Sequence, residues 1–177
     1  MEWLFVVAGV LVVLGIYLSW TAGRLDRLHA RLDASRAMLD AQFLRRSALV
    51  LEIATAGQLD PATSVLLADA ASRARTVDDD GRDQAESDLT EVLDAALGDP
   101  EDVTALSQDP VVGESFDELA KACRRAAHAR RFHNDMVRGA QRLRRKLLVR
   151  WLGLAGHAPW PETVELDDSV PAGLEGR

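Results

Sequence analysis

Hydrophobic and polar positions divide the chain into an apolar N-terminal run and a longer amphipathic remainder. Residues 3–20 read WLFVVAGVLVVLGIYLSW, and no charge appears until Arg24. At ~1.5 Å of rise per residue, a helix of this length crosses the ~30 Å hydrocarbon core of a bilayer. Aromatic rings stand near both ends of the run, where membrane interfaces favour them. The pattern predicts a transmembrane anchor over residues 2–22.

Three other interpretations of the apolar run fit it less well. A secretory signal peptide has a basic start and a shorter apolar core, whereas only Glu2 and the terminal amine precede this run. A lipoprotein signal ends at a cysteine, and the run has none. A core helix of a globular domain rarely lacks every charge over such a length.

Basic residues follow the run but do not precede it. Arg24, Arg27, Arg31 and Arg36 come directly after it. The positive-inside rule therefore places the rest of the chain in the cytoplasm. We expect a single-pass protein of the inner (cytoplasmic) membrane, with its N-terminus outside and its C-terminus in the cytoplasm.

Beyond the run, apolar residues recur mostly three, four or seven positions apart, which is the period of an amphipathic helix. Residues 24–56 contain no Pro or Gly, so they either continue the anchor helix or follow a hinge at Gly23. Further helices are predicted at 61–75, 82–97 and 112–151, with a non-helical turn at 78–81. Asp60–Pro61 and Asp99–Pro100 each suit an N-cap followed by a first helical residue, and a short helical turn after the second step is expected to hold Val103 and Leu106. The acidic, Pro-containing tail at 157–177 is expected to be irregular.

These elements predict an all-α protein. Its aromatic content is only 5%, while Ala, Leu and Arg, which favour helices, are plentiful. Short connections place successive helices antiparallel. We expect one N-terminal transmembrane helix followed, at 24–152, by an antiparallel three- or four-helix bundle with long first and last helices.

Charge is segregated along the chain, although the net charge is only −7. Residues 78–102 carry eleven acids and one base, and residues 121–150 carry eleven bases and one acid. Two solvated helix faces that attract each other explain this pattern. Segregated charge also marks binding surfaces, so that alternative stays open.

Motifs of known catalytic chemistry are missing from the sequence. It has no Gly-rich phosphate loop, GxSxG, HExxH or zinc pattern. His128 and His133 are five residues apart and share a helix face poorly. The single cysteine, Cys123, excludes an intramolecular disulfide and is expected to be a half-buried helix residue. We expect no enzyme activity, no cofactor and no metal.

Two groups of side chains are candidates for function. The first is a polar network or partner surface, in which a buried ion-pair network that fixes helix register is one interpretation and a peptide groove another. Its members are Arg45, Arg46, Glu52, Arg130, Arg131, Asn134 and Asp135. The second is a reversible contact with anionic lipid at 142–160, since the last helix should return towards the membrane. Its members are Arg142, Arg144, Arg145, Lys146, Arg150 and Trp151. The alternative is that these bases only pair with the acidic segment.

Several stretches resemble the LemA family of bacterial membrane proteins over roughly residues 1–157. ARRFHND at 129–135, with Val137 and Arg138, is similar to the family's ARRxYND-V-R stretch. LRR at 44–46, SDLT at 87–90 and FDEL at 116–119 resemble further family segments in the same order. Leu51 and Glu52 depart from the family's Pro-Asn, and His133 from its usual Tyr. The resemblance implies an anchored antiparallel helical bundle and supplies no known enzymatic activity.

Together these observations predict a non-catalytic, membrane-anchored scaffold or adaptor. Its partners would be the lipid bilayer, a protein of unknown identity and, in a homo-oligomer, further copies of the chain. Nucleic-acid binding through the basic last helix is an alternative, because its charge suits phosphates. No nucleic acid is expected, since stacking aromatics are nearly absent and the whole chain is acidic. An unrecognised enzyme is the remaining alternative.

Overall fold

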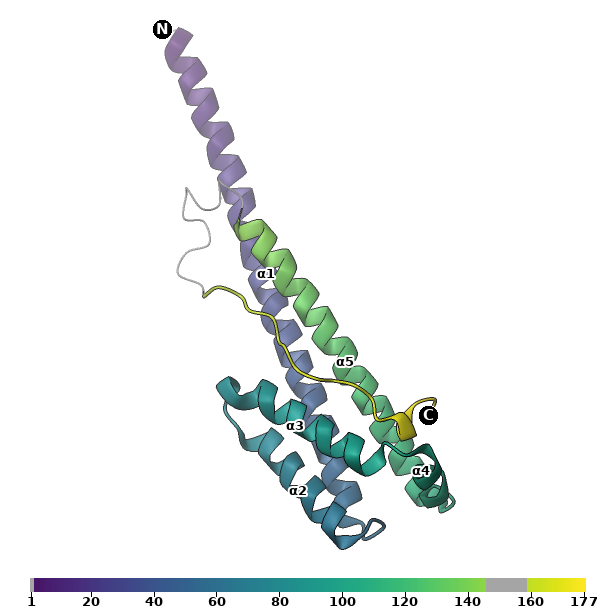
Figure 1. Cartoon of the computed structure of the whole chain (residues 1–177). Coiled ribbons are helices and arrows are strands. Elements are labelled where there is room, and N and C mark those ends of the chain that lie inside the picture. Colours follow the sequence, from purple (N-terminus) through teal and green to yellow (C-terminus); the bar gives the residue numbers. More distant parts are fainter. Residues whose placement is uncertain (1, 146–158) are drawn as a thin grey trace. The chain divides into compact units, whose positions relative to one another are not determined.

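The computed structural model describes residues 2–145 and 159–177. They form helices and no strand, which confirms the all-α prediction over these residues (Figure 1). The long helices are α1 (Glu2–Thr55) and α5 (Pro110–Arg144). Between them lie α2 (Pro61–Thr76), α3 (Asp79–Leu97) and α4 (Pro100–Leu106). A 3₁₀ turn, η1 (Ala172–Leu174), lies in the C-terminal segment.

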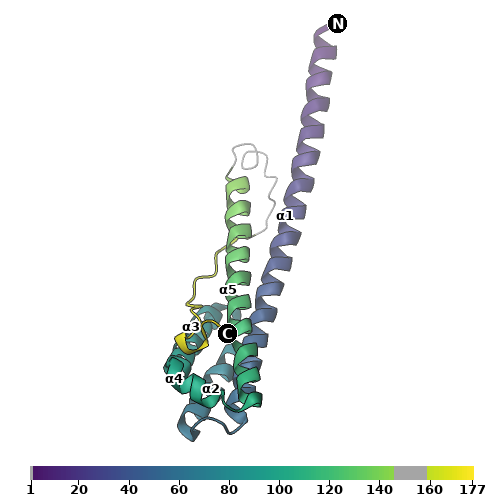
Figure 2. The ribbon, with the colours of Figure 1, turned by 90° about the vertical axis from the view of Figure 1, so that its right-hand side faces the viewer.

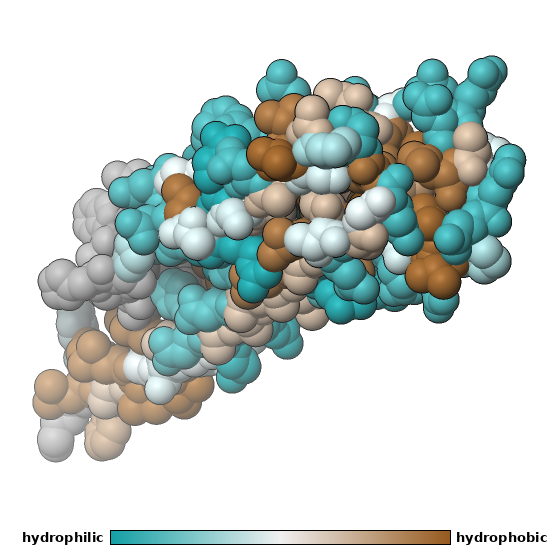
Figure 3. All heavy atoms as spheres, turned by 90° about the horizontal axis from the view of Figure 1, so that it is seen from below, coloured by the Kyte–Doolittle hydropathy of each residue, from teal (hydrophilic) through white to brown (hydrophobic). Residues whose placement is uncertain are grey.

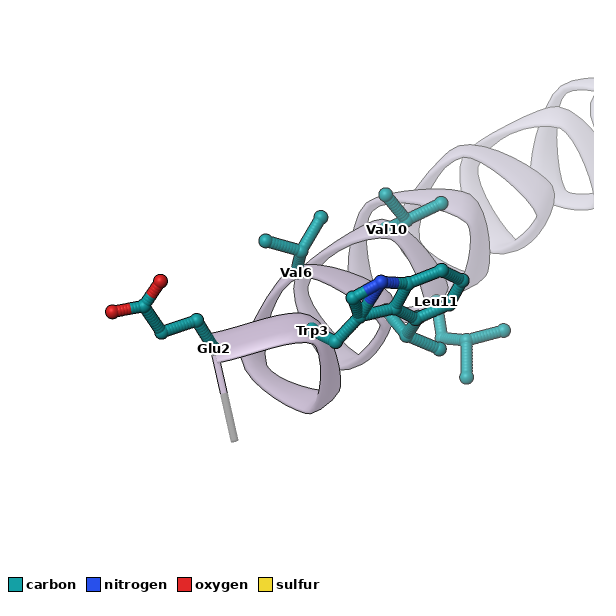
Figure 4. Close-up of a pocket in the computed structure, with 6 residues that line it drawn as sticks. Glu2, Trp3, Val6, Val10 and Leu11 are labelled. Atoms are coloured by element: carbon teal, nitrogen blue, oxygen red, sulfur yellow. The ribbon is translucent and has the colours of Figure 1, made fainter.

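Helix α1 is continuous through Gly23, so the hinge allowed by the sequence does not form. Its N-terminal part is long and apolar enough to cross a membrane and is almost entirely exposed. Figure 4 shows Trp3, Val6, Val10 and Leu11 around a shallow hollow on this helix, which also includes Glu2 and Val7. A core helix of a globular domain would instead have these side chains covered.

Local chemistry explains where the middle helices begin. Gly57 has φ +75°, which glycine adopts without strain, and ends the turn after α1. The Asp60 carboxylate accepts from the backbone N–H groups of Ala62 and Thr63 and caps α2, with Pro61 at its first position. Asp99 caps α4 in the same way through Glu101 N.

Two expected boundaries were wrong. Residues 78–81 are not a turn, because Asp79 and Asp80 form the first turn of α3, where acids are favoured by the helix dipole. Helix α5 begins at Pro110, two residues before the expected start, because Pro fits the first helical position. Its expected end at residue 151 lies outside the described residues.

Contacts divide the chain into two units. The first contains residues 1–36 and 133–163, and the second contains residues 37–132 and 164–177. The second unit holds the main apolar core, to which α1, α2, α3, α4 and α5 all contribute. Leu67, Leu89, Phe116 and Leu119 are completely buried in it. Figures 1 and 2 show α2 beside α3 within this unit.

The C-terminal segment is irregular, as expected, but its residues 164–177 pack against the helices of the second unit. We call residues 164–177 the strap. Val164 and Leu174 of the strap are buried, and η1 packs against α4 (Figure 2). The sequence predicted its lack of helix and not its packing.

Candidate functional site

A buried ion pair joins α1 to α3 in the second unit. Arg46 and Glu86 are each 1% exposed. Arg46 Nη2 lies 2.5 Å from Glu86 Oε2 and donates to the Glu86 carbonyl oxygen at 2.9 Å, while Nη1 donates to Thr90 Oγ1 at 3.0 Å. The guanidinium carbon lies 5.9 Å from the centroid of the Phe43 ring, within cation–π range. Three acceptors and one ring therefore fix this guanidinium.

Helical period explains why these polar groups face the core. Arg46 lies three residues after Phe43 and four before Val50, which are both buried, so it shares their face of α1. Glu86 lies on the face of α3 that carries Leu89 and Leu93. Burial raises the pKa of the Glu86 carboxyl, and the adjacent Arg46 guanidinium partly offsets that rise.

Thr90 connects the buried pair to the strap. Its hydroxyl accepts from Arg46 and lies 2.9 Å from the carbonyl oxygen of Asp167 and 3.0 Å from that of Glu86, to one of which it donates. One hydroxyl thus contacts three segments of the chain. Arg46, Glu86 and Thr90 are hereafter the polar core.

Ion pairs hold the strap along its length. Arg130 of α5 binds Asp168 with two parallel bonds, Nε to Oδ2 at 2.7 Å and Nη2 to Oδ1 at 2.8 Å. This bidentate geometry raises the pKa of Arg130. Nearer the end, Arg177 Nη1 lies 3.2 Å from Asp117 Oδ1, and Arg124 donates to the Arg177 backbone oxygen.

Backbone contact fixes the strap at Gly173. A Cβ atom at this position would lie 2.4 Å from the Leu97 carbonyl oxygen and 2.7 Å from Val103 Cγ2. No side chain fits there unless the strap moves. The adjacent Leu174 then fills the core, where it is completely buried.

The seven residues of the predicted polar network do not form one buried cluster. Arg45, Glu52, Arg131 and Asp135 are exposed, and Asp135 pairs with Arg138 at 3.2 Å. Arg46 joins the polar core, Arg130 binds the strap, and Asn134 is buried in the first unit. The partners that the sequence did not indicate are Glu86, Thr90 and Asp168. Glu86 could have been found, because it lies three residues before Leu89 on an apolar helix face.

A buried serine–histidine contact joins α1 and α5 in the first unit. Ser35 Oγ lies 2.9 Å from His133 Nδ1 and 2.7 Å from the Leu32 carbonyl oxygen, to which it donates. Ser35 is 3% exposed and His133 is 4% exposed. A nucleophile must meet its substrate, and neither side chain is accessible, so this contact is one of packing.

A basic hollow lies between α1 and α5 in the first unit. It has a volume of about 510 Å³. Its lining residues are Arg24, Arg27, Leu28, Arg31, Gly139, Arg142 and Leu143. We call this group the arginine hollow.

The predicted lipid-contact residues are placed only in part. Arg142 lines the arginine hollow. The guanidinium carbons of Arg144 and Arg145 lie 5.3 and 5.9 Å from the centroid of the Trp160 ring, and Arg144 donates to the Pro159 carbonyl oxygen. Lys146, Arg150 and Trp151 lie outside the described residues.

Reactive or metal-binding groups are not gathered in the part of the chain that the structure describes. Within it, no three His, Cys, Asp or Glu side chains are placed to hold a metal ion. Cys123 is buried, more completely than expected, and burial raises the pKa of its thiol. A thiol of raised pKa is a poor nucleophile at neutral pH.

No family model, no curated protein and no solved structure matches this chain.

Proposed function

We propose that the chain is a membrane-anchored scaffold or adaptor without catalytic activity, of LemA-like type. Its helical part would be an antiparallel three- or four-helix bundle on the cytoplasmic face of the inner membrane. The exposed apolar start of α1 carries this proposal. From Trp3 to Trp20 its large hydrophobic side chains are mostly 39–78% exposed, which a chain surrounded only by water would not sustain.

Flanking charge supports the proposed orientation. Arg24 and Arg27 lie within about one helical turn after the apolar segment, and Arg31 one turn further. Basic residues close to a span are retained on the cytoplasmic side. The second unit, which follows in α1, would then lie in the cytoplasm.

Exposed apolar side chains outside the anchor support an adaptor role. Val65 and Leu66 of α2 are 68% and 61% exposed, and Val111 at the start of α5 is 66% exposed. Figure 3 shows hydrophobic side chains in patches between hydrophilic ones. Apolar patches with polar surroundings are typical of protein contacts.

Nucleic-acid binding has weaker support. Several bases of α5 are already engaged by acidic or backbone oxygens, including Lys121 with Glu118 and Arg130 with Asp168. A phosphate would have to displace these partners. Filter binding that weakens steeply with salt would favour this alternative.

Crosslinking in intact cells, followed by purification in detergent, tests the adaptor role. We would compare the wild type with Val65→Asp/Leu66→Asp and with Arg131→Ala/Asp135→Ala, using Arg75→Gln as an exposed control. A reproducible protein partner, lost in one double variant and kept in the control, supports the proposal. If only lipid and self-crosslinks are found, the adaptor role is excluded under those conditions.

A further inference from the structure

We propose that the arginine hollow binds the phosphate headgroup of an anionic phospholipid in the leaflet around the anchor. This inference rests on the proposed membrane anchoring and names a ligand for it. The hollow belongs entirely to the first unit, and both of its walls come from described helices.

Helical spacing gathers the basic side chains into one wall. Arg24, Arg27 and Arg31 are three and four residues apart, so they lie along one face of α1. Leu28 lies between them on that face. From α5, Arg142 adds a fourth guanidinium, and Gly139 leaves the wall open where another residue would place a side chain.

These guanidinium groups are available to a ligand. Unlike Arg46 and Arg130, none of the four is ion-paired to a carboxylate within the described residues. The guanidinium carbon of Arg24 lies over the Trp20 ring, 5.8 Å from its centroid, and this cation–π contact occupies no hydrogen-bond acceptor. Guanidinium N–H groups match phosphate oxygens in pairs, so four of them around one hollow favour a phosphate ligand.

Position along α1 favours a lipid over a soluble phosphate. The uncharged segment ends at Gly23, and Arg24 is the next residue. Arg31 lies only about 10 Å further along the helix axis. That distance falls in and just beyond the headgroup region of a bilayer whose apolar core ends at Gly23. Leu28 and Leu143 give the hollow an apolar surface that suits the glycerol and upper acyl carbons.

Binding to the full chain in detergent micelles tests this site. A fluorescent phosphatidylglycerol is titrated into the wild type, Arg27→Gln/Arg31→Gln and Gly139→Leu, with phosphatidylcholine as the zwitterionic comparison. The Leu variant keeps every charge but fills the hollow, and a Cβ at residue 139 meets only Arg142 Nη2, at 4.0 Å. Arg75→Gln/Arg125→Gln, which removes two exposed charges of the second unit, is the matched control.

We expect both hollow variants to bind phosphatidylglycerol about tenfold or more weakly than the wild type, and the control to bind within twofold of it. The proposed site is wrong if the control variant loses as much affinity for phosphatidylglycerol as the hollow variants, or if Gly139→Leu binds it as tightly as the wild type. Either result would mean that the basic side chains attract the lipid without a defined site. Displacement of the lipid by millimolar inorganic phosphate would assign the hollow to a soluble phosphate instead. Circular dichroism checks that each variant keeps its helix content.

Alkaline extraction of membranes separates this inference from the anchoring on which it rests. The hollow variants keep the apolar segment, so they should stay in the membrane pellet with the wild type. If the wild type is extracted, the proposed anchoring is wrong. If the wild type stays in the pellet but the hollow variants bind lipid as strongly as it does, only the proposed headgroup site is wrong.

Discussion

Arg46 and Glu86 occupy positions at which the helical period favours apolar side chains. Taking two charges out of water costs several kcal/mol for each ion, and their attraction offsets that cost only if both are well bonded. Here the guanidinium has acceptors from Glu86 and Thr90, and Glu86 has its counter-ion. We therefore expect the pair to fix how α1 meets α3 more than it adds to stability.

Replacing only Arg46 or only Glu86 should lower the unfolding free energy much more than replacing both. Arg46→Met or Glu86→Leu alone leaves an uncompensated buried charge, for which we expect a loss of about 3–5 kcal/mol in unfolding free energy. The double variant Arg46→Met/Glu86→Leu should be closer to the wild type than either single variant. Thermal unfolding of the full chain in micelles, followed by circular dichroism, measures this. Additive losses would show that the two residues do not act as a pair.

Glu86 also predicts a pH dependence. Because its folded-state pKa is raised, its contribution to stability is fully present below the unfolded-state pKa and is lost as the pH rises through the folded value. Glu86→Gln lacks this titration. The melting temperature of the wild type minus that of Glu86→Gln should therefore fall as the pH rises from about 4. A difference that rises over that range would mean that Arg46 outweighs burial.

The sequence could have indicated that Arg46 is buried and could not have identified its partner. Arg45 and Arg46 point about 100° apart on α1, and the phase set by Leu39, Phe43 and Val50 selects Arg46. Pairing with Glu86 depends on how α3 lies against α1, which no local pattern contains. The same holds for Arg130, whose partner is 38 residues away in an irregular segment.

Elements with strong local signals were predicted well. The Asp60–Pro61 and Asp99–Pro100 steps start helices at the expected places, because a capping carboxylate and a fixed proline φ act locally. The strap has neither periodicity nor caps that predict its course. Its placement depends on surfaces of α3, α4 and α5 that exist only after those helices have packed.

Gly173 gives a direct test of the strap. Gly173→Ala adds one carbon against the Leu97 carbonyl oxygen and should displace the strap. Limited proteolysis of the full chain should then cleave residues 164–177 faster than in the wild type. Ala172→Ser adds one atom at the exposed neighbouring position and should be cleaved at the wild-type rate. Equal protection of Gly173→Ala would show that the strap tolerates a side chain there.

At the scale of the whole molecule, the second unit and the N-terminal segment of α1 differ in how much of their apolar surface is exposed. In the second unit most large apolar side chains are covered, whereas the N-terminal segment of α1 exposes nearly all of its own. Water penalises such exposure at roughly 25 cal/mol for each Å². A bilayer removes that penalty, and this contrast was already visible in the uncharged run at 3–20.

Charges in the middle of the run should abolish anchoring. Val12 and Val13 lie near its centre and are 61% and 68% exposed. Each Arg at such a position costs about 2.5–3.5 kcal/mol of insertion free energy, so Val12→Arg/Val13→Arg should move the protein from the membrane pellet to the alkaline-soluble fraction. Leu66→Arg, at an exposed position of α2, should remain in the pellet. Retention of the double variant would mean that α1 is not the anchor.

The contacts of Thr90 and Leu174 also set an order of events during synthesis. The helices of the second unit leave the ribosome before the strap, so the niche for Leu174 stays open to water until the strap follows. The Arg46–Glu86 bond needs only residues made in the first half of the chain, whereas the bond from Thr90 to Asp167 joins residues 77 apart. A nascent chain would thus hold its buried charges in place while its core still lacks the last covering side chain. That interval is when a chaperone or a protease would find apolar surface to bind.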